Sequence, residues 1–450
     1  MSAVPVTGEV LLEAQDLQVH FGLRGGFAQR LFGRQAGAVK AVDGVSLQLH
    51  RGEVLGLVGE SGSGKTTLAR ALLSLVPITG GEVRLGGQLI SNLSERDFRP
   101  YRRQLQMVFQ DPHASLNPSM PLVDAVGHPL RIHGITRDAR RIRETVGQAL
   151  ERVGLAPAER YLDKYPSDLS GGQKQRAVLA RAIILDPEVV VADEPVSMLD
   201  MSVRAQVLQL MLNLKSQLGL TYLYVTHDLA TARLFCDRIA IMYLGRIVET
   251  GPTAAVFDQP RHPYTESLLK AIPVPDPSHR VPRDLPPGEI PDAAAPPMGC
   301  SFHPRCRRAF GPCGWESRDL AALLEARWLE LPPAEFQADR AVVGDVARLA
   351  QPSRNAFVPA AAGHIGAEVA KLFEDQRRRR PDDRLWEGVA SMAVETGGLG
   401  VEFHPAVDPV LGPIGGAEPS TQVACHLYRE DLTGPEPAPP LGAPSPGQER

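Results

Sequence analysis

The stretch Gly59-Glu60-Ser61-Gly62-Ser63-Gly64-Lys65-Thr66-Thr67 decides the fold, because it fits the phosphate-binding loop pattern G-x-x-x-x-G-K-S/T. It follows a short apolar run, 54–58, and precedes a run of good helix formers, 68–73. The loop therefore joins a buried strand to a helix, as this motif requires. All nine residues are expected to surround the phosphates of ATP, with Lys65 at the β and γ phosphates and the Thr66 hydroxyl on Mg²⁺.

Length and composition set wider limits. The chain has 450 residues, of which 43% are hydrophobic, so it can form two or three globular domains. Its 48 basic and 52 acidic residues give a net charge of only −4, which does not favour nucleic acid as a partner. Because no run approaches 18 apolar residues and 1–10 does not resemble a signal peptide, we expect a chain that neither spans a membrane nor is secreted.

Two segments before the loop alternate apolar and polar residues. The runs 11–21 and 38–49 are predicted to be strands of an antiparallel sheet beside the nucleotide core. Phe21 ends the first run, where its ring could stack on the adenine of ATP. An aromatic residue at a strand end is as often part of the core, and the sequence leaves both interpretations open.

After the loop, an apolar strand over 105–109 ends in Gln110-Asp111-Pro112, where the proline stops it. From 122 to 168 the pattern becomes helical. Over 140–153, five apolar residues recur at spacings of three and four and so share one helix face. The region from about 111 to 168 is therefore predicted to be an inserted helical subdomain.

Two further segments present polar groups at the starts of helices or the ends of strands. Ser170 is placed to cap a helix that begins with Gly171, Gly172 and Gln173, an arrangement that offers a hydroxyl and N–H groups to a phosphate. An ordinary capped helix is the alternative. The buried strand 188–192 then delivers Asp193 and Glu194 to the sheet edge where parallel sheets bind ligands.

These two carboxylates suit different tasks. Asp193 is expected to hold Mg²⁺, and Glu194 to polarise the water that attacks the γ-phosphate. The chain then turns through 195–200 into a helix that reaches about residue 218, and a strand over 222–226 ends in His227. A lone histidine is more often structural, but its place at the same sheet edge as Glu194 favours a catalytic role.

Taken in order, these motifs resemble the ATP-binding subunit of an ABC transporter over roughly residues 11–255. The resemblance implies an α/β P-loop NTPase domain with a RecA-like parallel sheet, an antiparallel β subdomain and an inserted helical subdomain. It also implies a D-loop that includes Ser197, Leu199 and Asp200, with Met198 at a position usually held by alanine. A role for Gln110 in sensing Mg²⁺ and the attacking water, and a γ-phosphate contact for His227, come from the same resemblance.

Further segments resemble the oligopeptide, dipeptide and nickel importer branch, and more closely the second ATPase of such operons than the first. They are 109–112 with 115–118, the Glu-Pro-Val-Ser run 194–197, and His-Pro-Tyr-Thr at 262–265 with 268–273. The resemblance implies two ATPase subunits that meet head to tail, so that the signature residues 170–173 close over ATP on the partner's phosphate loop. Two membrane permease subunits, an extracytoplasmic solute-binding protein that acts through them, and a place on the cytoplasmic face of the membrane are implied as well.

The last third of the chain departs from this pattern. Proline-rich residues in 256–298 predict a linker, and four cysteines follow it at Cys300, Cys306, Cys313 and Cys425. Their surroundings resemble the tail of peptide-importer ATPases, where four cysteines can hold a [4Fe-4S] cluster; structural zinc or free buried thiols are the alternatives. Residues 314–424 form a long insert within this four-cysteine module (299–430), and 431–450 are predicted to be disordered.

The leading functional hypothesis is an ATPase that energises the import of peptides through a permease. A soluble ABC ATPase that is not coupled to transport is an alternative of another class, although such proteins usually carry two cassettes and this chain has one. An importer of nickel or another small solute is a second alternative, and a redox-sensing role for the cysteine module is compatible with the leading hypothesis.

Overall fold

The chain forms two compact units, Met1–Phe257 and Asp258–Arg450. The computed structural model describes residues 8–22, 38–111, 115–272, 286, 288–414, 421–429, 431, 432 and 434. Three of the sequence predictions lie outside these residues: Pro112 as the end of a strand, the linker over 273–285, and the tail beyond residue 434.

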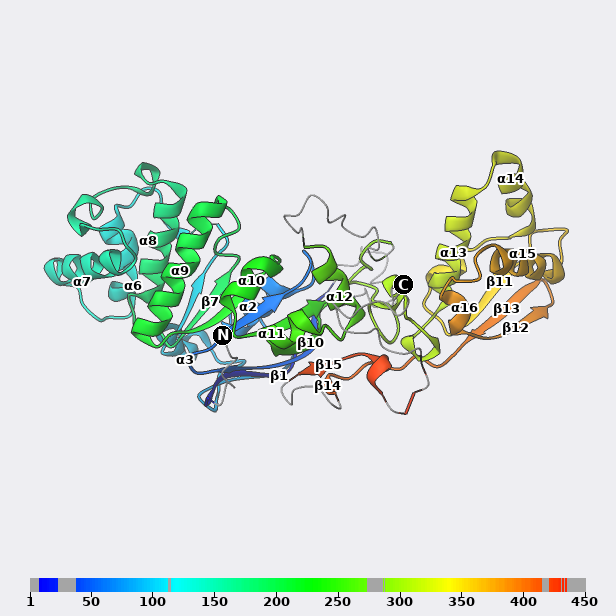
Figure 1. Ribbon diagram of the computed structural model, residues 1–450, viewed down its shortest axis with the longest axis horizontal. Helices are drawn as coiled ribbons and strands as arrows, with labels where there is room; N and C mark the ends of the chain where they lie inside the picture. Colours follow the sequence, from blue (N-terminus) through cyan, green and yellow to red (C-terminus); the bar gives the residue numbers. More distant parts are fainter. Residues whose placement is uncertain are drawn as a thin grey trace, which may run out of the picture. The chain divides into compact units, whose positions relative to one another are not determined.

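A mainly parallel sheet forms the centre of the first unit (Figure 1), in the strand order β10-β9-β3-β8-β7-β6. All pairs are parallel except β9 with β10. Every residue of β3, β7 and β8 is buried, as the continuous apolar runs predict for strands covered on both faces. The strands are β3 (Val54–Val58), β6 (Leu105–Val108), β7 (Val189–Asp193), β8 (Thr221–Thr226), β9 (Arg238–Tyr243) and β10 (Arg246–Pro252).

Helices accompany these strands in the alternating order that parallel sheets need. Figure 1 shows α9 and α10 beside the parallel strands. Gly219 ends α9 with a positive φ of 66°, so the chain can turn back into β8. The helices are α2 (Lys65–Leu72), α9 (Met201–Leu218), α10 (Leu229–Phe235) and α11 (Thr253–Asp258).

A second sheet, antiparallel throughout, has the strand order β2-β1-β4-β5. Its first two strands confirm the alternating runs seen in the sequence. Leu12, Leu17 and Val19 of β1 and Val45 and Leu49 of β2 are all buried. The strands are β1 (Val10–Gly22), β2 (Ala38–His50), β4 (Gly80–Leu85) and β5 (Gln88–Leu89).

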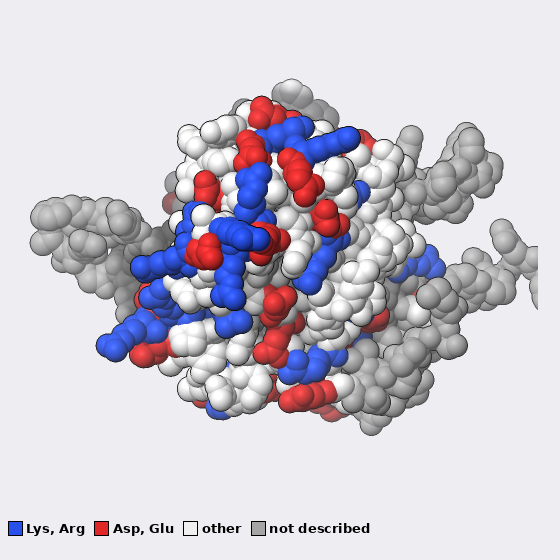
Figure 2. All heavy atoms as spheres, turned by 90° about the vertical axis from the view of Figure 1, so that its left-hand side faces the viewer, with Lys and Arg blue, Asp and Glu red and all other residues white. Residues whose placement is uncertain are grey.

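Two short helices before β6 and three longer helices between β6 and β7 complete the described part of the first unit. The predicted apolar face of α7 is confirmed, because Ile142, Val146, Ala149 and Leu150 are buried. Figure 2 looks onto this end of the molecule, where Lys and Arg side chains crowd together with acidic side chains among them. The helices are α3 (Glu95–Phe98) and α4 (Tyr101–Gln104), both before β6, then α6 (Leu122–Ile132), α7 (Ala139–Arg152) and α8 (Gly171–Ile183).

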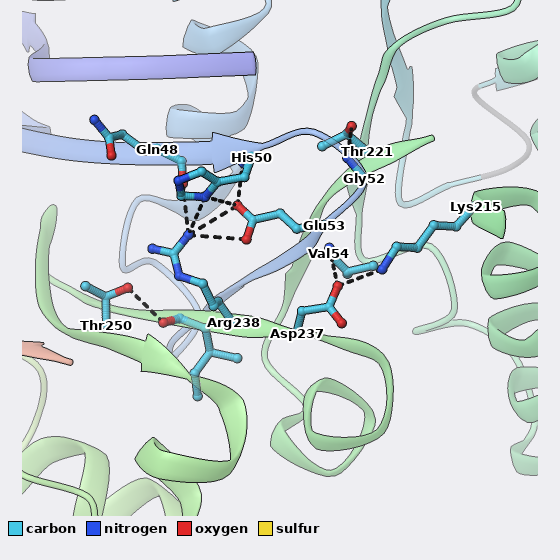
Figure 3. A network of polar contacts seen from close by, with 11 residues as sticks. Gln48, His50, Gly52, Glu53, Val54, Lys215, Thr221, Asp237, Arg238 and Thr250 are labelled. Carbon is cyan, nitrogen blue, oxygen red and sulfur yellow. Dashed lines mark hydrogen bonds and ion pairs between the residues drawn. The ribbon is translucent and has the colours of Figure 1, made fainter. Parts of the chain in front are cut away.

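A network of polar contacts fastens the amino-terminal ends of the parallel strands (Figure 3). Glu53, just before β3, is 2% exposed and accepts hydrogen bonds from the His50 backbone N–H at 2.6 Å and from Arg238 Nη1 at 3.2 Å. Asp237 accepts from the Val54 N–H at 2.8 Å and from Lys215 Nζ at 2.7 Å. The strand that leads to the phosphate loop is thus tied to β9 and α9.

The second unit begins with α12 (Pro263–Lys270), which is capped by a buried histidine. Nδ1 of His262 accepts a hydrogen bond from the Tyr264 N–H at 3.1 Å. Burial lowers the pKa of His262 to about 3, so the ring stays neutral and Nδ1 can act as an acceptor. The physical role of this His-Pro-Tyr segment is therefore to start a helix.

The insert 314–424 forms a small α/β fold of its own within the second unit. Three antiparallel strands lie in the order β11-β13-β12, and the buried side chains of α15 pack on them. Arg377, Arg378 and Arg379 in the last turn of α15 are exposed. The elements are α13 (Ser317–Glu330), α14 (Pro333–Val342), β11 (Asn355–Pro359), α15 (Gly366–Arg379), α16 (Leu385–Gly388), β12 (Val389–Glu395), β13 (Gly398–Phe403), β14 (Gly412–Pro413) and β15 (Gln422–Val423).

Candidate functional site

The phosphate loop runs from the end of β3 to the start of α2, as predicted. Gly64 precedes α2 with φ of 102°, and a Cβ there would lie 2.0 Å from the Ala41 carbonyl oxygen. At Gly59 a Cβ would lie 2.2 Å from the Met242 carbonyl oxygen. Both positions therefore admit only glycine, since the loop passes too close to neighbouring backbone for any side chain.

Lys65 is buried within this loop. Its Nζ donates hydrogen bonds to the carbonyl oxygens of Gly59 at 2.9 Å and Glu60 at 2.8 Å. Burial lowers the pKa of Lys65, and the nearby carboxylates of Glu194 and Asp193 oppose that shift. The ammonium group thus lies beside the two carboxylates that the sequence assigns to the same site.

The Thr66 hydroxyl donates to Oδ1 of Asp193 at 3.1 Å. Asp193 ends β7 and is only 2% exposed. Burial raises the pKa of Asp193, with a further increase from the charge of Glu194, while the Thr66 hydrogen bond lowers it. A hydroxyl and a carboxylate in contact, in a site that favours neutralising the carboxylate, form a donor set that fits Mg²⁺.

Glu194 contacts two of the other predicted site residues. Oε2 of Glu194 accepts from Nε2 of Gln110 at 3.2 Å, and Oε1 lies 2.8 Å from Nδ1 of His227. The backbone of Glu194 has φ of 47°, which is uncommon for a residue other than glycine, and its N–H donates to the Val225 carbonyl at 2.9 Å. Such strain is typical of functional sites, and here it occurs at the residue whose carboxylate contacts Gln110 and His227.

A cavity of about 260 Å³ lies beside this carboxylate, lined by residues that include Glu194, His227 and Arg204. The sequence gives no signal for Arg204, which is one charged residue within a long helix. Its Nη1 pairs with Asp228 at 3.2 Å, and its Nη2 donates to the Leu199 carbonyl at 3.2 Å. Arg204 thus connects the loop that follows Glu194 to the residue that follows His227.

The segment 170–173 forms the capped helix start that the sequence predicts. Ser170 Oγ accepts from the Gln173 N–H at 3.4 Å, and Gln173 Oε1 accepts from the Ser170 N–H at 3.1 Å. Ser170 and Gly171 are exposed, and Gly172 packs so closely on Val203 that a Cβ would meet it at 2.6 Å. Each of the two side chains therefore accepts a hydrogen bond from the backbone N–H of the other residue. The start of the segment remains on the surface.

In the 197–200 loop, Ser197 Oγ donates to the Glu194 carbonyl at 3.0 Å, and Asp200 caps α9 by accepting from the Val203 N–H at 3.0 Å. Leu199 is half-buried, and Met198 is 62% exposed. Phe21 is 45% exposed at the end of β1. The core interpretation of Phe21 is therefore wrong, and its stacking on adenine stays a prediction.

The four late cysteines approach one another in the second unit. The Cys300 N–H donates to the Cys313 carbonyl at 2.9 Å, and the insert returns to this segment where the Val407 N–H donates to the Pro312 carbonyl at 3.0 Å. All four are free thiols. Burial raises the pKa of each thiol, to about 12 for Cys313, and a negative charge on Cys306, Cys313 or Cys425 would raise that of Cys300 further.

Among the described residues, no group of three or more histidine, cysteine, aspartate or glutamate side chains is arranged so that it could hold a metal ion. The fifth cysteine, Cys236, is separate and buried in the first unit, where its Sγ would be 2.7 Å from a Cβ on Gly56. Cys236 therefore packs against β3.

Comparison with known proteins agrees with this geometry. The ABC transporter family matches residues 42–197, and the C-terminal region of oligopeptide/dipeptide transporters matches residues 248–313. The oligopeptide transport ATP-binding protein AppF of Bacillus subtilis is 46% identical over 308 residues, which are 68% of this chain and 92% of that protein. The chain belongs to the ABC transporter family of ATP-binding proteins.

A second ABC relative, the oligopeptide transport ATP-binding protein OppF of Escherichia coli, is 42% identical over 70% of this chain and 93% of that protein. A dimeric ATP-binding cassette solved with ADP and phosphate is 27% identical, covers 54% of this chain and 99% of that one, and has a TM-score of 0.47. Membership of the family makes this chain an ATPase with the P-loop α/β fold, and ATP and Mg²⁺ its ligands.

Proposed function

We propose that this ATPase energises the import of peptides through two membrane permease subunits. The observation that carries the proposal is the contact of Glu194 with both Gln110 and His227, next to Lys65 and Asp193. The choice of peptides rests on the relatives, which are named as oligopeptide transport proteins. Nickel or another small solute is the alternative cargo.

In the proposed mechanism, Lys65 and the N–H groups of the loop bind the phosphates of ATP, and Phe21 stacks on the adenine. Thr66, Asp193 and Gln110 hold Mg²⁺, which neutralises charge on the phosphates. Glu194 takes a proton from a water whose oxygen attacks the γ-phosphorus as the bond to ADP breaks. Because Nδ1 of His227 contacts Glu194, Nε2 of the same ring is the atom that would contact a γ-phosphate oxygen.

A second ATPase subunit completes the site in this proposal. Ser170, Gly171, Gly172 and Gln173 lie together at the start of α8, where the hydroxyl and helix N–H groups suit a phosphate. They would close over ATP on the partner's phosphate loop, with Ser197, Leu199 and Asp200 at the contact between the subunits. The partner is another ATP-binding subunit of the same family, and solute reaches the permease from an external binding protein.

The cellular place proposed is the cytoplasmic face of the membrane, through contact with the permease. In the part of the chain that the structure describes, no helix is long and apolar enough to cross a membrane. A soluble ABC ATPase is the alternative of another class. Fractionation distinguishes the two, since this chain should sediment with membranes only while its permease is present.

Uptake of labelled di- and oligopeptides by the source cells tests the function, with a chromosomal Lys65→Ala variant compared with wild type. Lys371→Ala is the matched control, since Lys371 is an exposed lysine on α15. Uptake should fall to background only in the Lys65 variant. If uptake persists while the purified variant has lost ATP hydrolysis, peptides are the wrong cargo, and nickel and small glycosides are the next solutes to try.

The second part of the proposal is a [4Fe-4S] cluster on Cys300, Cys306, Cys313 and Cys425, with zinc as the alternative. The support is that four thiols, two of them buried and two partly buried, have raised pKa values and lie within reach of one another's charge. A bound cation offsets the cost of turning thiols into thiolates, so four cysteines have the chemistry that either group needs, although their side chains are not gathered into a metal site in the described residues. The cluster would cross-link the chain on both sides of the insert and add a one-electron redox couple.

Metal analysis of anaerobically purified protein tests this part. About four irons and four sulfides per chain are expected for the cluster, against about one zinc for the alternative. Cys425→Ser should lose the metal, whereas Cys236→Ala should keep it. Wild-type protein without iron, sulfide and zinc would remove the hypothesis. A redox-sensing role would further require that loss of the cluster changes ATP hydrolysis or uptake.

A further inference from the structure

An open pocket of about 730 Å³ in the first unit lies apart from the ATP site and shares no residue with it. It is formed by α3, α4 and the residues between them, by the end of α6 with the loop after it, and by the segment between α8 and β7. Its basic lining residues are Arg96, Arg99, Arg103, Arg131, His133 and Arg137. Five arginines in one pocket make it a concentrated positive site.

Three of these arginines have no partner within the described part of the chain. The side chains of Arg96, Arg103 and Arg137 are exposed and form no hydrogen bond or ion pair there. Arg99 differs, because its Nη2 donates to the Ile132 carbonyl at 2.6 Å. Arg131 pairs with Asp124 at 2.7 Å. The unpaired guanidinium groups are therefore free to bind an anion from outside.

Two acidic residues also line the pocket, but each faces a basic residue of its own. Glu188 pairs with Arg51 at 2.8 Å, and Asp186 lies 3.9 Å from Arg152. In the described part of the chain, neither side chain forms a hydrogen bond or ion pair with the three unpaired arginines. The acidic residues thus reduce the positive charge of the pocket without neutralising those three.

The pKa of His133 reflects the positive charge around the pocket. Burial lowers the pKa of His133 most, and the charges of Arg99, Arg103 and Arg102 lower it further. A positive field that disfavours a protonated histidine favours an anion at the same place. Arginine also suits phosphate in particular, since its planar fork can donate two parallel hydrogen bonds to two phosphate oxygens.

We propose that this pocket binds the phosphate groups of a ligand that carries at least two of them. Two sources share that chemistry: a soluble polyphosphate, and clustered headgroups of anionic phospholipids. Ile132, which lines the pocket, and Ile135, three residues further along the chain, are 48% and 43% exposed, and apolar side chains beside basic ones are typical of contact with a lipid surface. The proposal does not depend on which solute the transporter carries.

Occupancy of the pocket would have a structural consequence. Arg96, Arg99 and Arg103 precede β6, the strand after which Gln110 follows, whereas Arg137 belongs to the loop between α6 and α7. A phosphate bound by both groups bridges the segment that leads to the ATP site and the helical part of the unit. Ligand binding is therefore expected to raise the melting temperature of wild-type protein.

Binding measurements on the full chain test the proposal, with the ATP site filled by Mg²⁺ and a non-hydrolysable ATP analogue. The triple variant Arg96→Ala, Arg103→Ala, Arg137→Ala is compared with the triple control Arg141→Ala, Arg160→Ala, Arg378→Ala, which loses the same charge from exposed positions outside the pocket. One arm titrates sodium tripolyphosphate. A second arm measures sedimentation with vesicles of phosphatidylglycerol and phosphatidylcholine, and a third titrates an acidic peptide of equal charge.

We expect the pocket variant, but not the control, to bind tripolyphosphate, the vesicles, or both about tenfold more weakly or worse. Loss in the vesicle arm alone identifies lipid as the source, and loss in the tripolyphosphate arm alone identifies a soluble ligand. Equal behaviour of the two triple variants in both arms overturns the proposal. So does a difference confined to the acidic peptide, which would assign the pocket to a protein partner. Unchanged ATP hydrolysis by the pocket variant verifies that it folds.

Discussion

The two ends of the parallel sheet use charged residues in opposite ways. At the amino-terminal ends of the strands, Glu53 is enclosed by His50 and Arg238, and the network leaves its carboxylate fully bonded (Figure 3). At the carboxyl ends, Glu194 has a strained backbone, and its contacts come from Gln110 and His227, whose side chains reach the surface. The contacts at the amino-terminal ends therefore stabilise the strands. At the carboxyl ends, backbone strain lowers stability but keeps polar groups in place for a ligand.

The largest expected effect is the loss of ATP hydrolysis in a Glu194→Gln variant, at the carboxyl end of the sheet. Glu194→Gln keeps the shape of the side chain but removes the carboxylate that would take the proton from water. ATP hydrolysis should fall about 100-fold or more, because a positioned general base commonly contributes that much. Phosphate release measures the rate, nucleotide binding should persist, and the free energy of unfolding should stay within about 0.5 kcal/mol of wild type. Undiminished turnover would remove Glu194 from the role of base.

The matching change at the other end should act on stability. Glu53→Ala removes a buried carboxylate and leaves Arg238, whose side chain is only 16% exposed, without its partner, so we expect a loss of about 3 kcal/mol in the free energy of unfolding. Denaturant unfolding measures it. Glu188→Ala is the control, because the ion pair of Glu188 with Arg51 is exposed and should cost less than about 1 kcal/mol. The comparison between the ends breaks if Glu53→Ala lowers turnover per folded molecule as strongly as Glu194→Gln.

The two ends also differ in how far the sequence predicts them. Lys65, Asp193, Glu194 and His227 each follow a recognisable strand, and the carboxyl ends of parallel strands meet at one edge. Their approach to one another is therefore predictable from local patterns alone. The capped start of α8 is predictable for the same reason, because its signal lies within a few consecutive residues.

The contact between Glu53 and Arg238 joins residues 185 positions apart, and neither stands in a motif. Arg204 likewise is one arginine within a helix, and only the fold brings it to Asp228. Tertiary packing decides such contacts, so single-sequence patterns contain no trace of them. The approach of Cys425 to the earlier cysteines is an intermediate case, expected from resemblance and not from any spacing in this chain.

A smaller loss of stability is expected from a change at Asp237, which like Glu53 lies at the amino-terminal ends of the parallel strands. Asp237→Ala removes an acceptor for the Val54 N–H and for Lys215 Nζ, at a site where Asp237 is 42% exposed. We expect a loss of about 1–2 kcal/mol in the free energy of unfolding, less than at Glu53, because the buried Val54 N–H loses its acceptor but Lys215, which is 21% exposed, can still be hydrated. Lys215→Ala should cost less still, since Asp237 then keeps its bond to Val54. Equal losses in the two variants would show that the ion pair, not the backbone bond, fastens β3.

The smallest expected effect concerns Thr221, whose Oγ1 accepts a hydrogen bond from the Gly52 N–H at 2.9 Å. Thr221 is fully buried at the start of β8, and valine has nearly the same shape. Thr221→Val should therefore lower the free energy of unfolding by about 1 kcal/mol, since Gly52 is exposed and its N–H can turn to water. Turnover per folded molecule should not change, although β8 leads directly to His227. A loss of turnover without loss of stability would mean that the two ends of the sheet are coupled along β8, and the division of tasks between them would fail.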